Sequence, residues 1–295
     1  MQAFHKRSYA LLTALVHYII RIYSSIFYIY CRFQPLIYPF FQKTDGFLRL
    51  PPAHQIPFIE PVFMALWDYT QRVLAAVLLL LLTPVLIIAF GIMWISDFKH
   101  PLFIHTRIGK DGKPFLMFKM RTMRVRSSHI TVPSNSPEIT LVGRIFRRFK
   151  IDEFLQLINV IKGDMLLIGP RPVVFSEWKT YSAKEKQVMR LTPGISDFAS
   201  IFLSRMGRFL AQHDNPEQAF HQICKPIRSR LSLFYLEHRS LTVDLKLLFF
   251  NATNFISHRW TLKHMARQIV KLGDCGIPYA VLSGEQEPIP LPPVQ

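Results

Sequence analysis

The run VLAAVLLLLLTPVLIIAFGIMWI, residues 73–95, carries no charge and constrains the fold more than any other part of the sequence. As a continuous helix it would be about 34 Å long at about 1.5 Å per residue, enough to cross the hydrocarbon core of a bilayer. Its centre is Thr83-Pro84. Proline removes a backbone donor and clashes with the carbonyl one turn earlier, at a cost of about 3 kcal/mol, so Pro84 predicts a membrane kink. Each half would then span roughly half of the hydrocarbon thickness.

Basic residues stand on both sides of this run and favour a re-entrant helix over a straight span. They are Lys43, Arg49 and Arg72 before it, and Lys99, Arg107, Lys110, Lys113, Lys119, Arg121, Arg124 and Arg126 after it. Because Lys and Arg collect on the cytoplasmic side of a membrane, both ends are predicted to be cytoplasmic. A helix that enters the membrane and turns back satisfies both ends. An ordinary Pro-kinked transmembrane helix is the alternative.

Composition narrows the class of partner. The chain has 295 residues, a formal net charge of +17 and 50% hydrophobic residues, so it can bury a sizeable core and favours anionic partners. Its apolar runs favour phospholipid head groups or a phosphorylated substrate, and without a helix-turn-helix, zinc or base-stacking signature we predict no nucleic-acid partner. The scattered cysteines, Cys31, Cys224 and Cys275, indicate a reducing compartment and no disulfide framework.

Residues 1–63 form an apolar and aromatic extension followed by a proline-rich linker. The segment YALLTALVHYIIRIYSSIFYIYC is interrupted by His17 and Arg21, and no A-x-A-like cleavage site follows it. A signal peptide, a weak membrane span or an amphipathic surface helix would fit, and we favour membrane association without cleavage. Met64 directly precedes the next element, which leaves open that translation starts there.

The segments after the apolar run predict a small β-hairpin and several helices. PLFIHTRIGKDGKPFLMFKMRTM predicts two strands joined around Asp111-Gly112, and the loop SNSPE leads into a helix that starts near Leu141. LSLFYLEHRSLTVDLKLLFFNATNF predicts a long amphipathic helix, broken near His238 to Ser240, that lies in the membrane interface or covers the core. The tail EPIPLPPVQ is predicted to be disordered.

Another helix follows the basic segment FRRFK. Its apolar stripe at i, i+3, i+4 and i+7 consists of Phe154, Leu157, Ile158 and Ile161, and its polar stripe consists of Asp152, Gln156 and Asn159. Gly163 ends the helix. Asp152 and Glu153 begin it, where unpaired amides favour acids by about 0.3 to 1 kcal/mol, so an ordinary helix start would explain this pair.

The surroundings of the pair point instead to phosphate chemistry. More positive charge precedes it than two carboxylates need: Arg144, Arg147, Arg148 and Lys150. Downstream, Pro170 and Pro172 fix the backbone on both sides of Arg171, which predicts a preset, bidentate anion clamp in place of a simple rigid turn. In phosphoryl transfer, carboxylates supply a nucleophile or hold Mg²⁺, and cations neutralise phosphate oxygens.

Six motifs in a fixed order identify a family. They are the Pro-broken apolar helix, RIGKDGKPF with FKMRTM, GRIFRRFKIDEFLQLINVIKGDM, LIGPRP, LTPGIS and LEHRSLTVDLKLL. From Asp68 to Asn251 the sequence resembles the bacterial sugar transferases, the monotopic polyprenol-phosphate phosphoglycosyl transferases that begin cell-surface glycan assembly on a lipid carrier. We therefore expect an α+β, mainly helical fold, with a membrane-embedded Pro-kinked re-entrant helix, a small β-hairpin and amphipathic interfacial helices. The expected divisions after the extension are 64–98 for the membrane helix, 99–255 for the cytoplasmic transferase domain and 256–295 for a C-terminal tail.

The resemblance also implies a reaction and its residues. Asp152 would attack the β-phosphate of a UDP-sugar, release UMP and hold the phosphosugar covalently until undecaprenyl phosphate accepts it. Glu153 would bind Mg²⁺ with Asp152 or assist proton handling. The implied phosphate-binding residues are Arg171, Lys119, Arg121 and Arg148, and Gly169, Pro170 and Pro172 would shape the turn.

The implied setting is the cytoplasmic face of the inner membrane. There the reaction would be the first membrane step of exopolysaccharide, capsule, O-antigen or glycoprotein glycan assembly, among membrane lipids and downstream glycosyltransferases. Leu155, Leu166 and the segment ISDFASIFLSR depart from the family pattern, and that segment leaves the sugar undetermined. The alternative is a noncatalytic membrane-bound interaction protein of the same fold in a glycan-assembly complex.

Overall fold

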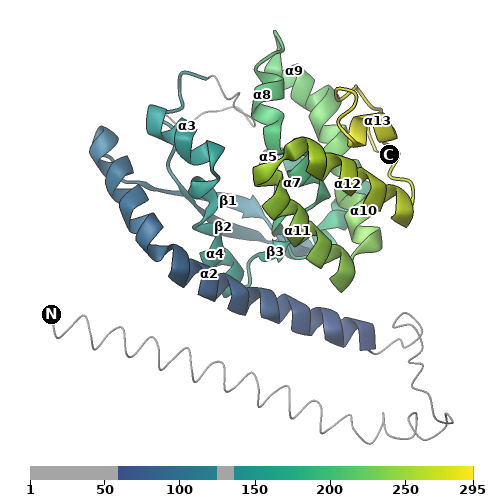
Figure 1. Cartoon of the computed structure of the whole chain (residues 1–295), viewed down its shortest axis with the longest axis horizontal. Coiled ribbons are helices and arrows are strands. Elements are labelled where there is room, and N and C mark those ends of the chain that lie inside the picture. Colours follow the sequence, from purple (N-terminus) through teal and green to yellow (C-terminus); the bar gives the residue numbers. More distant parts are fainter. Residues whose placement is uncertain (1–58, 125–135, 295) are drawn as a thin grey trace, which may run out of the picture. The chain divides into compact units, whose positions relative to one another are not determined.

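A single long helix, α2 (Ile59–Asp97), dominates the N-terminal side of the computed structural model (Figure 1). The structure describes residues 59–124 and 136–294, so the predictions for residues 1–58 lie outside the described residues. Within α2, Val62–Ser96 is long and apolar enough to cross a membrane by length and composition, and 17% of its most apolar window is buried. α2 begins before the predicted position 64 and stays helical through Pro84 while it curves along its length (Figure 1). Re-entry into the membrane remains a prediction.

The β-hairpin has the predicted strands and turn. β1 (Leu102–Ile108) pairs antiparallel with β2 (Pro114–Met120), in a register that runs from Leu102 opposite Met120 to Ile108 opposite Pro114. The turn, η2 (Lys110–Gly112), has φ of 56° at Asp111 and 75° at Gly112. Asp and Gly tolerate this left-handed region best, which is why the pair marks the turn in the sequence.

Two short helices and a 3₁₀ turn follow the hairpin. α3 (Leu141–Arg148) starts where predicted, and the Thr140 hydroxyl caps it by accepting from the Gly143 amide at 2.9 Å. The predicted second helix is split into η3 (Ile151–Glu153) and α4 (Gln156–Lys162), and Gly163 ends it at φ 86°. Its polar stripe packs inward: the fully buried Asn159 accepts from the Phe118 amide and donates to the Leu116 carbonyl, which fastens α4 to β2.

A second small sheet, absent from the predicted fold, carries the Gly-Pro-Arg-Pro turn. β3 (Leu166–Ile168) runs parallel to β4 (Gly194–Ser196). A Cβ on Gly194 would lie 2.1 Å from the backbone nitrogen of Gly169, so both positions need glycine. The Ile168 amide donates to Oε1 of Gln71 on α2 at 2.9 Å, which ties this sheet to the long helix.

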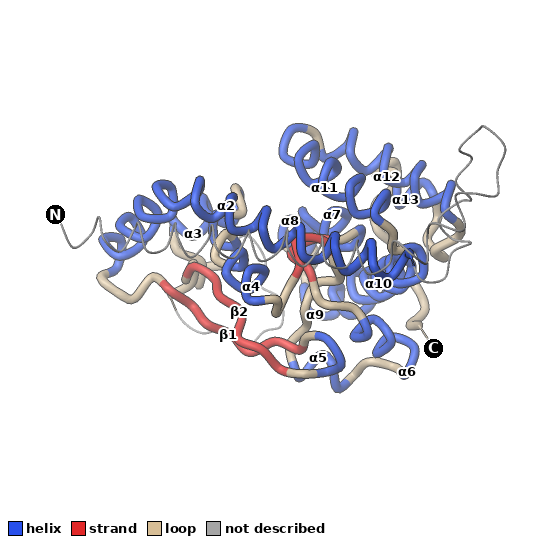
Figure 2. The backbone as a smooth tube through the Cα atoms, turned by 90° about the horizontal axis from the view of Figure 1, so that it is seen from below, coloured by secondary structure: helices blue, strands red, loops and turns tan. Residues whose placement is uncertain are grey.

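Short helical segments connect β3 to the C-terminal helices. They are α5 (Phe175–Lys179), α6 (Ala183–Lys186), η4 (Gln187–Arg190), α7 (Phe198–Phe202), η5 (Leu203–Arg205), α8 (Met206–Leu210), α9 (Pro216–Ala219) and η6 (Phe220–Cys224). α10 (Lys225–His238) and α11 (Leu241–Ile256) follow, so the predicted break near His238 to Ser240 is confirmed. With the helices after them they form a layer on one side of the molecule (Figure 2).

The C-terminal region is ordered, and the predicted disorder of its end is wrong. α12 (His258–Leu272) and α13 (Tyr279–Leu282) bury apolar residues in the main core, among them Met265. Beyond α13, Ile289 and Leu291 pack against the same core, and Arg230 donates to the Pro292 carbonyl at 3.0 Å. Apolar residues alternate with the prolines here, so an extended segment gains buried area without needing amide donors.

Polar contacts join the start of α2 to α10 and α11. The carboxylate of Asp244, fully buried, accepts from Trp67 Nε1 at 2.9 Å and from the Tyr235 hydroxyl at 2.6 Å. Arg239 forms an ion pair with Asp68 of α2. The motif LEHRSLTVDLKLL therefore has a structural role: it fixes the first turns of α2 to the helical layer.

Candidate active site

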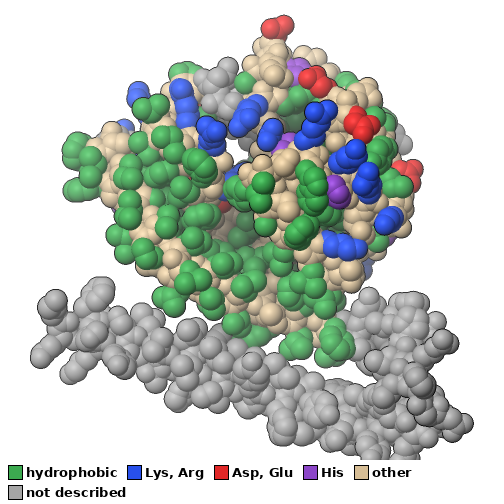
Figure 3. Space-filling model, in the orientation of Figure 1, with side chains coloured by type: hydrophobic (Ala, Val, Ile, Leu, Met, Phe, Trp, Pro, Cys, Tyr) green, Lys and Arg blue, Asp and Glu red, His purple; other side chains and the backbone are tan. Residues whose placement is uncertain are grey.

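A cavity of about 1810 Å³ lies between the hairpin, α3, the end of β3, the α7–α8 region and α11. Figure 3 shows a hollow with Lys and Arg side chains along its upper edge and hydrophobic side chains below. The apolar part of the lining includes Leu78 and Leu82 of α2 and Leu157 of α4. Cationic residues and both predicted catalytic carboxylates line it as well. Such a cavity can accept a ligand that is apolar at one end and anionic at the other.

Asp152 and Glu153 enter the cavity from η3. Lys150 precedes this 3₁₀ turn with φ of 59°, and this left-handed residue reverses the chain after α3. Asp152 is 7% exposed and Glu153 is 9% exposed. Acids of a helix first turn are usually solvated, so their burial in a cavity favours a functional role over an ordinary helix start.

Glu153 is fixed by two cations. Its Oε1 accepts from Lys119 Nζ at 3.0 Å and forms an ion pair with Arg171. Burial alone would raise the pKa of Glu153, but Arg171 and Lys119 outweigh it and hold the pKa well below its usual range. Glu153 is therefore a carboxylate at neutral pH, and it positions two of the four predicted phosphate-binding side chains, Lys119 and Arg171.

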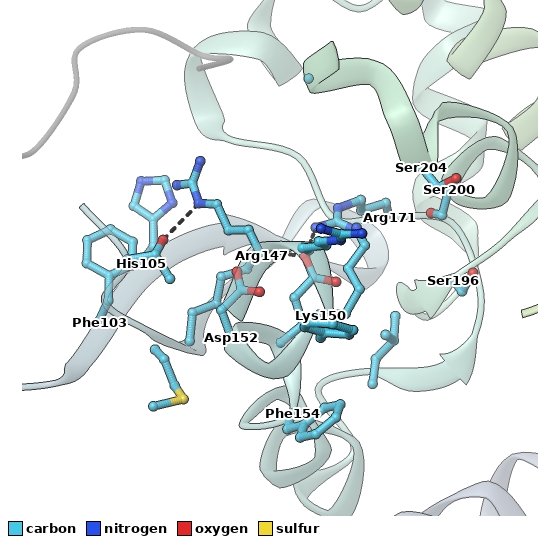
Figure 4. Close-up of a pocket in the computed structure, with 18 of the residues that line it drawn as sticks. Phe103, His105, Arg147, Lys150, Asp152, Phe154, Arg171, Ser196, Ser200 and Ser204 are labelled. Atoms are coloured by element: carbon cyan, nitrogen blue, oxygen red, sulfur yellow. Dashed lines mark hydrogen bonds and ion pairs between the residues drawn. The ribbon is translucent and has the colours of Figure 1, made fainter. Parts of the chain in front are cut away.

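Asp152 is held differently. Its Oδ1 is buried and has no hydrogen-bond partner among the residues that the structure describes. Burial and the charge of Glu153 raise the pKa of Asp152, while Lys119, Lys150 and Arg147 oppose that rise. Figure 4 shows Asp152 among Arg147, Lys150 and Arg171. Two adjacent carboxylates with pKa values shifted in opposite directions commonly have separate chemical roles.

The predicted phosphate-binding residues do not all reach these carboxylates. Arg171 and Lys119 do. Arg148 is exposed at the cavity lining, with its guanidinium carbon 5.9 Å from the centroid of the Phe149 ring. Arg121 also lines the cavity, yet its guanidinium donates to the carbonyls of His100, Met123 and Lys99, so it holds the open end of the hairpin together.

Two further arginines line the site: Arg107, which sequence reasoning did not assign to it, and Arg147, which it placed only in the basic segment before the carboxylates. Arg107 of β1 lines the cavity, and burial together with the nearby charge of Arg171 lowers its pKa to about 10. Arg147 of α3 donates from Nε to the Thr122 hydroxyl at 2.8 Å, and its charge opposes the rise in the pKa of Asp152. The alternation Phe103, His105, Arg107 in the strand was the available signal, because residues two apart share one face.

A divalent cation fits this site only with help from a substrate. Within residues 59–124 and 136–294 there is no group of three or more His, Cys, Asp or Glu side chains that could hold a metal ion. Mg²⁺ commonly uses one or two protein carboxylates and completes its shell with phosphate oxygens and water. The unpartnered Oδ1 of Asp152 beside Glu153 is compatible with that donor set.

Comparison with known sequences places this site in a family. The family described as bacterial sugar transferase matches residues 64–258. The uncharacterized sugar transferase EpsL of Bacillus subtilis (strain 168) is 31% identical over 189 residues, which are 63% of this chain and 84% of that protein.

Several relatives have names that state a reaction. The UDP-glucose:undecaprenyl-phosphate glucose-1-phosphate transferase of Escherichia coli (strain K12) is 31% identical over 183 residues, 60% of this chain and 37% of that enzyme. The UDP-galactose-lipid carrier transferase of Erwinia amylovora is 33% identical over 139 residues, 41% of this chain and 29% of that enzyme. This chain thus spans only about a third of either enzyme. Because the family match extends over more than half of the chain, this protein belongs to the bacterial sugar transferase family.

Proposed function

We propose that this protein transfers a sugar-1-phosphate from a UDP-sugar to undecaprenyl phosphate and releases UMP. The observation that carries the proposal is the state of Asp152: a buried carboxylate with an unpartnered oxygen, beside a Glu153 that holds Lys119 and Arg171 in the same cavity. Two relatives are named as a UDP-glucose:undecaprenyl-phosphate glucose-1-phosphate transferase and a UDP-galactose-lipid carrier transferase, which supports a UDP-sugar donor and a lipid acceptor.

The proposed reaction has two displacements at one phosphorus. Oδ1 of Asp152 forms a bond to the β-phosphorus, the bond from that phosphorus to the bridging oxygen breaks, and UMP leaves with that oxygen. An oxygen of undecaprenyl phosphate then attacks the aspartyl phosphosugar, which frees Asp152 and leaves a lipid diphosphosugar. Arg171, Lys119 and Arg107 neutralise the phosphate oxygens in both steps. Mg²⁺ held by Asp152, Glu153 and substrate oxygens would supply further neutralisation of the phosphate charge.

The proposed location is the cytoplasmic face of the inner membrane. α2 exposes apolar side chains along much of its length, and α11 exposes Phe249, Phe255 and Ile256. Leu78 and Leu82 bring α2 into the cavity lining, so the isoprenoid carrier can approach Asp152 from the apolar side and the soluble donor from the cationic side. Downstream glycosyltransferases that accept the product are the further partners we propose.

Activity is tested by UMP release from purified protein in lipid nanodiscs with Mg²⁺, undecaprenyl phosphate and a panel of UDP-hexoses and UDP-N-acetylhexosamines. We expect turnover with at least one donor, and no turnover in Asp152→Asn. Asp164→Asn is the matched control, because Asp164 pairs with Lys162 and does not line the cavity. Full activity of Asp152→Asn would refute the mechanism. No turnover with any donor, combined with co-purification of glycosyltransferases, would support the noncatalytic alternative.

The covalent intermediate and the topology each have a direct test. Incubation with the donor alone should add the mass of one phosphosugar to the wild-type chain and nothing to Asp152→Asn, as read by intact-protein mass spectrometry. Cysteines placed at Thr70 and Phe98, on either side of the uncharged run 73–95, should both react with a cytoplasmic reagent if the helix re-enters. Labelling from opposite sides would establish a membrane span instead.

A further inference from the structure

We propose that the cavity sets the direction in which the donor lies, with the sugar on a neutral polar wall of Asn254 and Ser204 and the base on the aromatic face of Phe103 and His105. This inference rests on the proposed function and adds to it the residues that select the sugar. Figure 4 shows the order of the parts: Phe103 and His105 lie on one side of the Asp152–Arg171 cluster, and Ser200 and Ser204 on the other. A UDP-sugar has the same order, with its diphosphate between base and sugar.

The aromatic side belongs to β1. The rings of Phe103 and His105 are stacked with their centroids 5.8 Å apart and an angle of 25° between their planes. Both residues line the cavity on the strand face that also carries Arg107. Two stacked rings next to cations suit a pyrimidine nucleotide, whose base can stack on a ring while its phosphates meet the cations. Stacking of a base on an aromatic ring needs only an accessible ring face and no particular hydrogen-bond pattern.

The opposite wall has side chains that are held by their neighbours. The Ser196 hydroxyl donates to Oδ1 of Asn251 at 2.7 Å, and Nδ2 of Asn251 donates to the Leu247 carbonyl at 2.9 Å. The Ser200 hydroxyl donates to the buried Asp197 at 2.7 Å. These bonds are internal to the protein, so they make the wall rigid and leave recognition to the groups next to them.

Asn254 and Ser204 are those groups, and His258 orients them. Nδ1 of His258 lies 2.7 Å from Oδ1 of Asn254 and 3.3 Å from the Ser204 hydroxyl oxygen. Burial, reinforced by Arg205 and Arg208, lowers the pKa of His258 to about 4, so the ring is neutral at pH 7. Because an amide oxygen can only accept, the contact with Oδ1 of Asn254 requires the tautomer that carries its hydrogen on Nδ1. Nδ2 of Asn254 then has no acceptor in the part of the chain that the structure describes.

The free donors match sugar oxygens better than phosphate. Asn254 offers an N–H pair and Ser204 an O–H, both uncharged, whereas the phosphates are already matched by Arg171, Lys119 and Arg107. Hydroxyl and acetamido oxygens are neutral acceptors. A site built to hydrogen-bond such a group discriminates strongly against a donor that lacks it. Asn254 and Ser204 are therefore specificity-determining residues for the sugar.

The test compares the full donor with UMP, which has the base and one phosphate but no sugar. Asn254→Ala and Ser204→Ala in the full chain should each raise KM for the active UDP-sugar about three- to tenfold, the loss expected for one neutral hydrogen bond, and leave the UMP inhibition constant unchanged. Phe103→Leu should weaken UMP and the donor together. Gln268→Ala is the control, because this carboxamide bonds Lys246 and does not line the cavity.

The outcomes separate this inference from the proposed function. The inference would be overturned if KM is unchanged in both Asn254→Ala and Ser204→Ala. It would also be overturned if the UMP inhibition constant rises as much as KM does. Neither result would contradict the proposed transfer reaction. If Asn254→Ala lowers the melting temperature more than Gln268→Ala does, the less disruptive Ser204→Ala decides. A wild-type protein that releases no UMP from any donor would refute the proposed function and this inference with it.

Discussion

Replacing Glu153 by Gln should destabilise the protein strongly, because one carboxylate holds two cations. Lys119 and Arg171 both contact Oε1 of Glu153, and the three side chains are 19%, 35% and 11% exposed, in that order. Removing one partner of a buried pair typically costs about 3 to 5 kcal/mol. Since Arg171 keeps some contact with solvent, we expect the low end, about 3 kcal/mol. For a unit of this size that corresponds to a fall of about 6 to 12 °C in melting temperature.

The assay is thermal unfolding of the nanodisc-embedded protein, read by intrinsic fluorescence. Glu237→Gln is the matched control, because Glu237 is exposed and surface substitutions usually stay within about 0.5 kcal/mol. Adding Lys119→Met to Glu153→Gln should recover part of the loss, because one fewer buried cation then lacks a partner. A melting temperature for Glu153→Gln equal to that of the control would refute this account of the site.

The same variant has a defined pH dependence. The folded-state pKa of Glu153 lies well below its ordinary 4.5, because Arg171 and Lys119 outweigh the effect of burial. A depressed pKa contributes stability that is fully present above the unfolded value and is lost as the pH falls through the folded value. The gap between wild type and Glu153→Gln should therefore be complete at pH 7 and shrink only in acid below about pH 4.5.

Three further predictions concern the site and its support. Burial and the charge of Glu153 raise the pKa of Asp152, so the rate of UMP release should begin to fall in acid at a pH above 3.8. Glu153→Gln should shift this fall in rate to lower pH, and an unchanged pH profile would exclude the coupling between the two carboxylates. Gly194→Ala should prevent folding, since its Cβ would meet a backbone nitrogen at 2.1 Å, whereas Gly91→Ala, with nothing within 4 Å, should fold normally; equal expression and melting of the two would contradict this. Asp244→Asn should lower the melting temperature by the equivalent of about 2 to 3 kcal/mol, because the Asp244 carboxylate accepts from Trp67 and Tyr235 and lies beside Arg239. An unchanged melting temperature would mean that Asp244 does not fix α2 to α10 and α11.

Local signals in the sequence predicted much of the fold. Asp111-Gly112 specified the hairpin, Gly163 the end of α4, and the polar break after His238 the boundary between α10 and α11. Each of these positions depends on backbone conformation or on residues close in sequence. The ordered C-terminal region depends on contacts with α10 and the core that are distant in sequence, and proline content alone predicted the opposite.

The sequence singled out the three residues at the centre of the candidate site, which the structure places in one cavity, and their chemical roles remain predictions. Asp152, Glu153 and Arg171 stood out because charge and rigid turns concentrate around them. Strand pairing and the hydrogen bonds of each side chain decide which cations lie near Asp152 and Glu153, and neither can be derived from a local sequence pattern. Arg121 uses its guanidinium on backbone carbonyls, while Arg107 on the paired strand lies near Arg171 and Glu153. The wall around Asn254 brings together segments that no local pattern connects.

The close backbone contact between Gly169 and Gly194 constrains one part of the site far more than the other. Backbone lies directly on backbone there, so the path of the chain just before Arg171 depends on main-chain geometry, while Glu153 holds the Arg171 side chain. The polar wall of Asn254 and Ser204 and its neighbours are held by side-chain hydrogen bonds, which substitution can rearrange. If the wall binds the sugar as proposed, a lineage could exchange one transferred sugar for another by altering the wall, while the proposed phosphate-binding residues stay in place.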